Sequence, residues 1–127
     1  PSYLATACAA YPQDLFKKVV KALSLRGSKF IHVLAPCPPG WRFSSEMTVE
    51  MGRLAVKSGM WILYEREFGK VTINGPSKAA MIKPVPLEDY LAGQGRFRGI
   101  DRKAVDALKS QAEQRARHLQ KEAEGLC

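Results

Sequence analysis

The chain has 127 residues, of which 46% are hydrophobic and 25% charged, and its formal net charge is +8. These values are typical of one globular domain with a single core and exclude global disorder or a fibrous repeat. No apolar run approaches the about 18 residues that cross a bilayer, which argues against a membrane protein. The chain opens on Pro1 and reads at once as a strand, so we expect a piece of a longer protein.

The first third of the chain predicts a βαβ unit. The apolar segment YLATACA indicates a buried strand, Pro12 suits the first turn of a helix that Gly27 ends, and the run from Phe30 to Ala35 is a second strand. We expect the two strands to be parallel. The helix carries an apolar stripe of Leu15, Phe16, Val19, Val20 and Leu23, and Lys17, Lys18 and Lys21 are expected to face solvent.

Cys37 follows the second strand in the turn PCPPGW. It lies at the carboxyl end of that strand, which is the edge of an open α/β sheet where ligands bind. The flanking prolines restrict φ and disfavour helix in the residue before each of them, so we expect a rigid, non-helical turn that Trp41 covers. A thiolate held in this way suits metal ligation or redox chemistry, although spacing alone leaves a structural role open.

The middle third of the chain predicts a helix followed by a hairpin. A helix from Ser44 or Ser45 runs to about Ser58, with Gly52 allowing close packing. The runs WILYE and KVTI predict a hairpin over residues 61–73.

The last third predicts a connector and two helices. Residues 76–86 read as a connector and residues 87–94 as a short helix. Asp101 caps a final helix that lasts to about Glu124. The apolar stripe of this helix is thin, so we expect it to pack loosely or on another chain.

The segment GQGRFRG, residues 93–99, superficially resembles a phosphate-binding loop. Its glycines are wrongly spaced for the common motifs and no strand precedes it. Arg96, Phe97 and Arg98 interleave basic and aromatic residues as nucleic-acid binders do, but a solvated turn with one anchored phenylalanine is the better interpretation.

The two histidines and the other two cysteines are expected to have no role in a functional site. We expect His32 in the core or on the sheet surface, His118 on the helix surface, Cys8 as an inert core thiol and Cys127 as a mobile last residue. The three cysteines include no CxxC pair and leave an odd thiol, which favours a reducing, cytoplasmic setting.

Four segments together resemble one family. ATACAAYPQDLFKKVVKAL, FIHVLAPCPPGWRF, TVEMGRLAVKSGMWILYE and PVPLEDYLAGQGRFRGI follow in this order from Tyr3 to about Ile100, roughly three quarters of the chain. They resemble the C-terminal part of the β subunit of 2-oxoacid:ferredoxin oxidoreductases, most specifically the pyruvate type. The final helix contributes less to the resemblance.

The resemblance implies a specific role for Cys37. In such enzymes the β subunit is an α/β module that binds thiamine diphosphate and Mg²⁺ and carries a [4Fe–4S] cluster. The reaction is oxidative decarboxylation of a 2-oxoacid with coenzyme A, and electrons pass to ferredoxin. Three cluster cysteines come from an earlier part of the subunit and the fourth from the APC turn, which here is Cys37. Soft thiolates are the ligands that such clusters need.

The resemblance also limits what this chain can do. The GDG motif and the asparagine that hold Mg²⁺ and the diphosphate have no match here, so no catalytic or cofactor-binding residue is assigned, and the isolated chain is expected to bind no cofactor and to be inactive. Residues 1–60 are expected to form the last βαβ and following helix of a thiamine-diphosphate-binding parallel-sheet domain. Residues 61–127 are expected to form a hairpin, a connector and a C-terminal helical extension. Which 2-oxoacid is used stays open.

Partners follow from charge as well as from the resemblance, which implies the other subunits of the oxidoreductase. Six basic residues are candidates to attract an acidic ferredoxin: Lys17, Lys18, Lys21, Arg96, Arg98 and Arg102. The alternatives are a small basic nucleic-acid-binding module, against which acidic residues in the final helix argue, and a subunit-interaction module.

Overall fold

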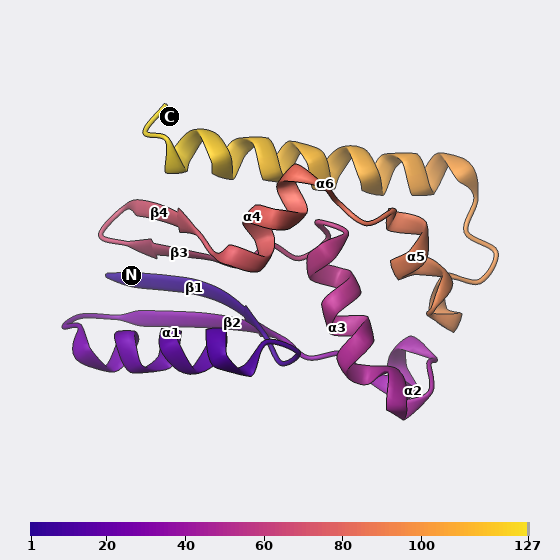
Figure 1. Cartoon of the computed structure of the whole chain (residues 1–127), viewed down its shortest axis with the longest axis horizontal. Coiled ribbons are helices and arrows are strands. Elements are labelled where there is room, and N and C mark those ends of the chain that lie inside the picture. Colours follow the sequence, from indigo (N-terminus) through magenta and orange to yellow (C-terminus); the bar gives the residue numbers. More distant parts are fainter. Residues whose placement is uncertain (127) are drawn as a thin grey trace.

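The protein is an α/β structure built on one mixed four-stranded sheet. The computed structural model describes residues 1–126. The strand order is β2-β1-β3-β4, with β1 (Tyr3–Cys8) parallel to β2 (Lys29–Leu34) and antiparallel to β3 (Tyr64–Glu67). β4 (Lys70–Ile73) pairs antiparallel with β3 at the other edge. Figure 1 shows helix α1 along the β2 side of the sheet and the long helix α6 along the β4 side.

The predicted βαβ unit is confirmed. β1 and β2 are in register from Tyr3 opposite Lys29 to Cys8 opposite Leu34, and α1 (Pro12–Ser24) connects them. Pro12 lies in the first turn of α1, where its missing N–H leaves no hydrogen bond unmade. The parallel pairing brings the carboxyl end of β2 beside the loop that leads from β1 into α1, so the Cys37 turn begins at this end of the sheet.

Helix α1 is oriented differently from the prediction, which was wrong for Lys18. Lys18 and Ala22 are its buried residues, whereas Phe16, Val20 and Leu23 of the apolar stripe are exposed. The Lys18 ammonium donates to the Thr6 carbonyl at 2.7 Å and to Asp14 Oδ2 at 2.6 Å. Burial lowers the pKa of Lys18, and the nearby Asp14 carboxylate opposes that shift. These two acceptors make the buried ammonium tolerable.

The predicted hairpin is confirmed, and it adds to the same sheet as the βαβ unit. Phe68 and Gly69 at its tip have φ of 45° and 89°, the positive values that a tight two-residue hairpin turn needs. The first strand begins at Tyr64, later than predicted, because Thr6 takes over the pairing: its hydroxyl donates to the Ile62 carbonyl and accepts from the Tyr64 N–H. One buried side chain thus extends the seam between β1 and the hairpin.

Five further helices within the described residues pack around the sheet and around one another. Their bounds are α2 Pro38–Trp41, α3 Thr48–Lys57, α4 Gly75–Ile82, α5 Leu87–Ala92 and α6 Arg102–Ala123, with short 3-10 turns at Ser45–Met47 and Gly95–Phe97. The predicted helices near 44–58, 87–94 and 101–124 are confirmed. The connector prediction for residues 76–86 was wrong in part, because Pro76 starts α4 instead of preventing it.

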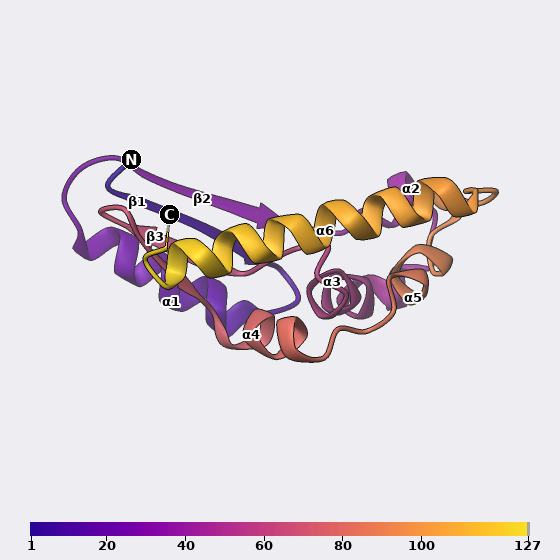
Figure 2. The ribbon, with the colours of Figure 1, turned by 90° about the horizontal axis from the view of Figure 1, so that it is seen from above.

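Two of these helices make specific contacts. A Cβ at Gly52 of α3 would lie 2.7 Å from Ala10 Cβ and 3.1 Å from Cys8 Sγ, so the predicted close packing is confirmed. The Asp101 carboxylate caps α6 by accepting from the Ala104 N–H at 2.7 Å. Figure 2 shows α6 running most of the length of the molecule, across the sheet and past α3 to α5. No helix among residues 1–126 is both long and apolar enough to cross a membrane.

Candidate functional site

Cys37 lies between the end of β2 and a single helical turn. It is itself extended, with φ −111° and ψ 103°, and Pro38 and Pro39 after it open α2. The expectation of a wholly non-helical turn was therefore wrong, because a proline in the first turn of a helix needs no N–H partner and its fixed φ suits the helix. The Trp41 N–H donates to the Cys37 carbonyl at 2.8 Å and closes this turn.

The thiol of Cys37 is exposed to solvent. A Cβ placed on Gly40 would lie 3.2 Å from Cys37 Sγ, so the thiol rests against the bare backbone of the helical turn. A side chain at position 40 would crowd the sulfur. The buried Pro36 before the cysteine anchors the other end of the turn in the protein. The arrangement presents one soft ligand, at the carboxyl end of a parallel strand, from a backbone held on both sides.

A second segment, residues 93–97, holds the Cys37 turn from outside, and the sequence did not reveal this. The Gly95 N–H donates to the Arg42 carbonyl at 2.8 Å, and a Cβ on Gly95 would lie 2.7 Å from Arg42 Cβ. The Arg96 guanidinium carbon lies 4.0 Å from the centre of the Trp41 ring. Phe97 packs on the core and Arg96 and Arg98 are exposed, as predicted, but Gln94 is a second, buried anchor that the sequence did not indicate.

The remaining candidates hold structural positions. Cys8 is fully buried, and burial raises the pKa of its thiol, as an inert core cysteine requires. His32 is exposed on the sheet surface, with its ring edge-on to Trp61 at 4.9 Å between centroids. His118 is on the surface of α6, 3.8 Å from a Glu122 oxygen. Cys127 lies outside the described residues.

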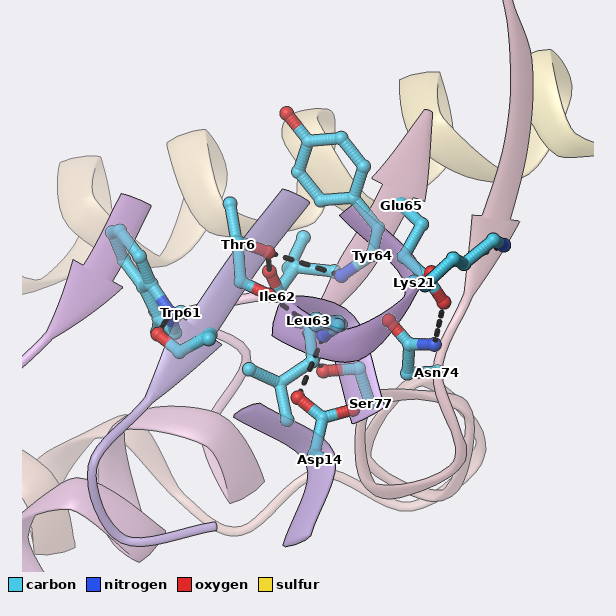
Figure 3. A network of polar contacts seen from close by, with 12 residues as sticks. Thr6, Asp14, Lys21, Trp61, Ile62, Leu63, Tyr64, Glu65, Asn74 and Ser77 are labelled. Carbon is cyan, nitrogen blue, oxygen red and sulfur yellow. Dashed lines mark hydrogen bonds and ion pairs between the residues drawn. The ribbon is translucent and has the colours of Figure 1, made fainter. Parts of the chain in front are cut away.

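A separate polar network joins α1 to the sheet around Glu65 (Figure 3). Glu65 accepts from the Tyr3 hydroxyl at 2.7 Å and from Asn74 Nδ2 at 2.8 Å, and Lys21 Nζ lies 3.2 Å away. Burial acts to raise the pKa of Glu65, but these three partners together outweigh it, so the pKa is lowered. Burial and the adjacent carboxylate raise the pKa of Tyr3. The network fastens the hairpin to α1, and one buried oxygen within it, Asn74 Oδ1, has no hydrogen-bond partner among the described residues.

The fit to an iron–sulfur cluster extends to one ligand. Within residues 1–126, no group of three or more His, Cys, Asp or Glu side chains converges as a metal site would require. Cys8 faces the backbone of α3, where its thiol lies 3.7 Å from the Gly52 carbonyl, and so cannot join Cys37. Among the described residues, Cys37 is therefore the one thiol that could ligate such a cluster, and the other ligands would have to come from elsewhere.

Comparison with known proteins adds to this geometry. No family model matches the chain. Pyruvate synthase subunit PorB of Methanocaldococcus jannaschii is 43% identical over 117 residues, which cover 92% of this chain and 38% of that protein. Ketoisovalerate oxidoreductase subunit VorB of Pyrococcus horikoshii is 40% identical over 122 residues, 96% of this chain and 39% of that protein. The chain is homologous to part of these PorB and VorB subunits.

A further PorB relative, from Methanothermobacter marburgensis, is 45% identical over 101 residues, which are 77% of this chain and 33% of that protein. The chain thus spans about two fifths of the length of the PorB and VorB relatives that it matches. PorB and VorB relatives occur at similar identity, so sequence similarity does not distinguish between these two kinds of subunit.

Proposed function

We propose that the chain is the C-terminal part of the β subunit of a 2-oxoacid:ferredoxin oxidoreductase and supplies Cys37 as the fourth ligand of a [4Fe–4S] cluster. The observation that carries the proposal is the exposed thiol on a doubly anchored turn at the carboxyl end of β2. The relatives named pyruvate synthase and ketoisovalerate oxidoreductase subunits support the reaction class. Pyruvate is the substrate that we propose, with coenzyme A as acyl acceptor.

The chain's own residues would contribute geometry to this reaction. The cluster, when bound, accepts and passes on single electrons. Cys37 would hold one iron, and the absence of a side chain at Gly40 leaves room for the sulfur to turn toward it. The two prolines of α2 and the hydrogen bond from the Trp41 N–H to the Cys37 carbonyl would restrict the position of the thiolate. Thiamine diphosphate and Mg²⁺ would bind to residues outside this chain, so the isolated chain would be inactive. A reducing cytoplasm would keep the sulfur of Cys37 reduced and available as a ligand.

Exposed apolar side chains support assembly with a larger subunit. On α1, Phe16 is 68% and Leu23 79% exposed, and on the edge strand β2, Phe30 is 55% exposed. A parallel edge strand with apolar residues in solvent is unusual, because parallel sheets are normally covered on both faces. We infer that further strands and helices of the complete subunit cover α1 and β2. This reading includes the subunit-interaction alternative.

Docking of an acidic ferredoxin is also part of the proposal, with fewer residues than the sequence indicated. Lys18 is buried, Lys21 pairs with Glu67 at 2.7 Å, and Arg102 pairs with Asp106 at 3.1 Å. Lys17 and Arg98 are exposed and stay available. Exposed charges of this kind would raise the association rate at low salt and matter little for affinity at high salt.

The test is ferredoxin reduction by the assembled enzyme that contains this chain. Pyruvate and ketoisovalerate are each supplied with coenzyme A, and reduced ferredoxin is followed optically. We expect reduction with pyruvate and its loss in Cys37→Ala. Undiminished reduction by Cys37→Ala would contradict the proposal, and reduction with ketoisovalerate alone would replace the substrate.

A further inference from the structure

Arg96 is exposed to solvent, but its guanidinium is held by hydrogen bonds to residues that are themselves buried. Its Nε donates to Gln94 Oε1 at 2.7 Å, and one of its terminal nitrogens lies 3.4 Å from the Tyr90 hydroxyl. Gln94 is 2% exposed and is itself fixed by a 2.7 Å hydrogen bond from Nε2 to the Tyr90 carbonyl. Burying an amide only to orient an arginine costs free energy, so the orientation of the guanidinium is the feature to explain.

The guanidinium is directed onto the turn that carries Cys37. It stacks between two aromatic rings, 4.0 Å from the centre of Trp41 and 4.7 Å from that of Phe97. Trp41 is the residue whose N–H closes the turn on the Cys37 carbonyl. A planar guanidinium that stacks on a ring and is hydrogen-bonded at its edge is rigid in a way that a lysine ammonium cannot be.

The backbone of the same segment is fastened to the far end of the turn. Arg42, which ends α2, has a left-handed φ of 59°, and its carbonyl accepts from the Gly95 N–H. That conformation is costly for arginine and persists only where neighbours hold it. Since Gly95 approaches Arg42 too closely to carry a side chain, segment 94–97 and the turn 37–42 form one packed unit.

We propose that Arg96, oriented by Gln94, is a positioning residue for the Cys37 turn and places a fixed positive charge next to the cluster that Cys37 ligates. Only the second part of this inference, the positive charge next to the cluster, rests on the proposed function. A cluster with four thiolate ligands is an anion, and reduction adds one more negative charge. A nearby cation therefore favours the reduced state and raises the reduction potential.

The first arm of the test needs no cluster and uses the 127-residue chain. Hydrogen exchange is measured at the Trp41 and Phe43 amides, which are bonded to the Cys37 and Pro38 carbonyls. We expect Arg96→Met to speed their exchange about tenfold, since the stacking contact that holds the turn is lost. Arg98→Met removes the same charge two residues along the segment and should leave their exchange unchanged. Equal exchange in Arg96→Met and the unaltered chain would overturn the positioning role.

The second arm measures the reduction potential of the cluster in the assembled enzyme by redox titration followed by electron paramagnetic resonance. Arg96→Met should lower the potential, and Arg96→Lys should lower it less because the charge remains while the planar stacking is lost. An unchanged potential in Arg96→Met, or an equal fall in Arg98→Met, would overturn the electrostatic role. If the cluster instead survives Cys37→Ala, the proposed function fails, while the exchange result still decides whether Arg96 holds the turn.

Discussion

The Thr6 hydroxyl is predicted to be the most important single polar group at the seam between β1 and the hairpin. It is buried and serves two backbone groups, the Ile62 carbonyl and the Tyr64 N–H (Figure 3). Thr6→Val keeps the shape but leaves both groups without their partner. A buried polar group without a partner costs about 1–3 kcal/mol, and because Tyr64 is only half-buried we take the lower half of that range for each group. The expected loss of unfolding free energy is about 2–4 kcal/mol, or roughly 10 °C in Tm for a chain of this size.

The assay is urea unfolding of the chain followed by far-ultraviolet circular dichroism, with Thr6→Ser as the matched control. Thr6→Ser keeps the hydroxyl and deletes one methyl group, so it should cost only about 1 kcal/mol. A larger loss in Thr6→Val than in Thr6→Ser is the predicted result. Equal losses in the two variants would show that packing, not the two hydrogen bonds, holds the seam.

Two further predictions concern packing and pH. Gly52→Ala gains about 1 kcal/mol of helix propensity, but its Cβ would lie 2.7 Å from the Ala10 methyl, which cannot rotate away. Thermal unfolding should therefore show a net loss of about 1 kcal/mol in stability. A higher Tm would refute the tight contact. Because the folded-state pKa of Glu65 is lowered, its contribution to stability is present above about pH 4.5 and is lost as the pH falls through the folded pKa. Glu65→Gln should therefore reduce the unfolding free energy at pH 7 and flatten its fall below pH 4.5 in urea titrations, whereas an unaltered slope would count against the Glu65 network.

Most helices and strands were predicted correctly because the residues that start, end or turn them are close together in the sequence. Pro12 and Gly27 bracket α1, and Phe68–Gly69 supplies the positive φ values of the hairpin turn. Asp101 identifies the start of α6 through its cap. Each of these features depends on residues within one turn of the chain, so spacing is enough to find it.

The errors came from tertiary contacts that override local pattern. The apolar stripe of α1 predicted the wrong buried face, because within this chain the Lys18 ammonium is bound by the Thr6 carbonyl of β1 and by Asp14 of α1. Residues 76–86 were predicted to form a connector, although Pro76 lies in the first turn of α4. Helix periodicity reports which residues prefer burial, and it cannot say which surfaces a given piece of chain has available.

The candidate site was predicted in part. The position of Cys37 after a β-strand and between prolines made it a candidate, and the resemblance to a known family gave the candidate a specific role. The support from residues 94–97 was missed because Arg96 and Trp41 are far apart in sequence. The available signals were an arginine beside a glycine, Arg96 and Gly95, and a tryptophan elsewhere in the chain, Trp41. Sequence alone does not show which aromatic ring an arginine side chain will contact.

The most direct test of the central claim is the iron and acid-labile sulfide content of the complete oxidoreductase carrying Cys37→Ala, with Cys8→Ala as the control. Cys8 is buried and its thiol lies against the Gly52 carbonyl, so its removal should cost some stability and no iron. The account predicts that Cys37→Ala loses the cluster ligated by this subunit while Cys8→Ala retains it. Full iron and sulfide content in Cys37→Ala would contradict the assignment of Cys37 as a cluster ligand.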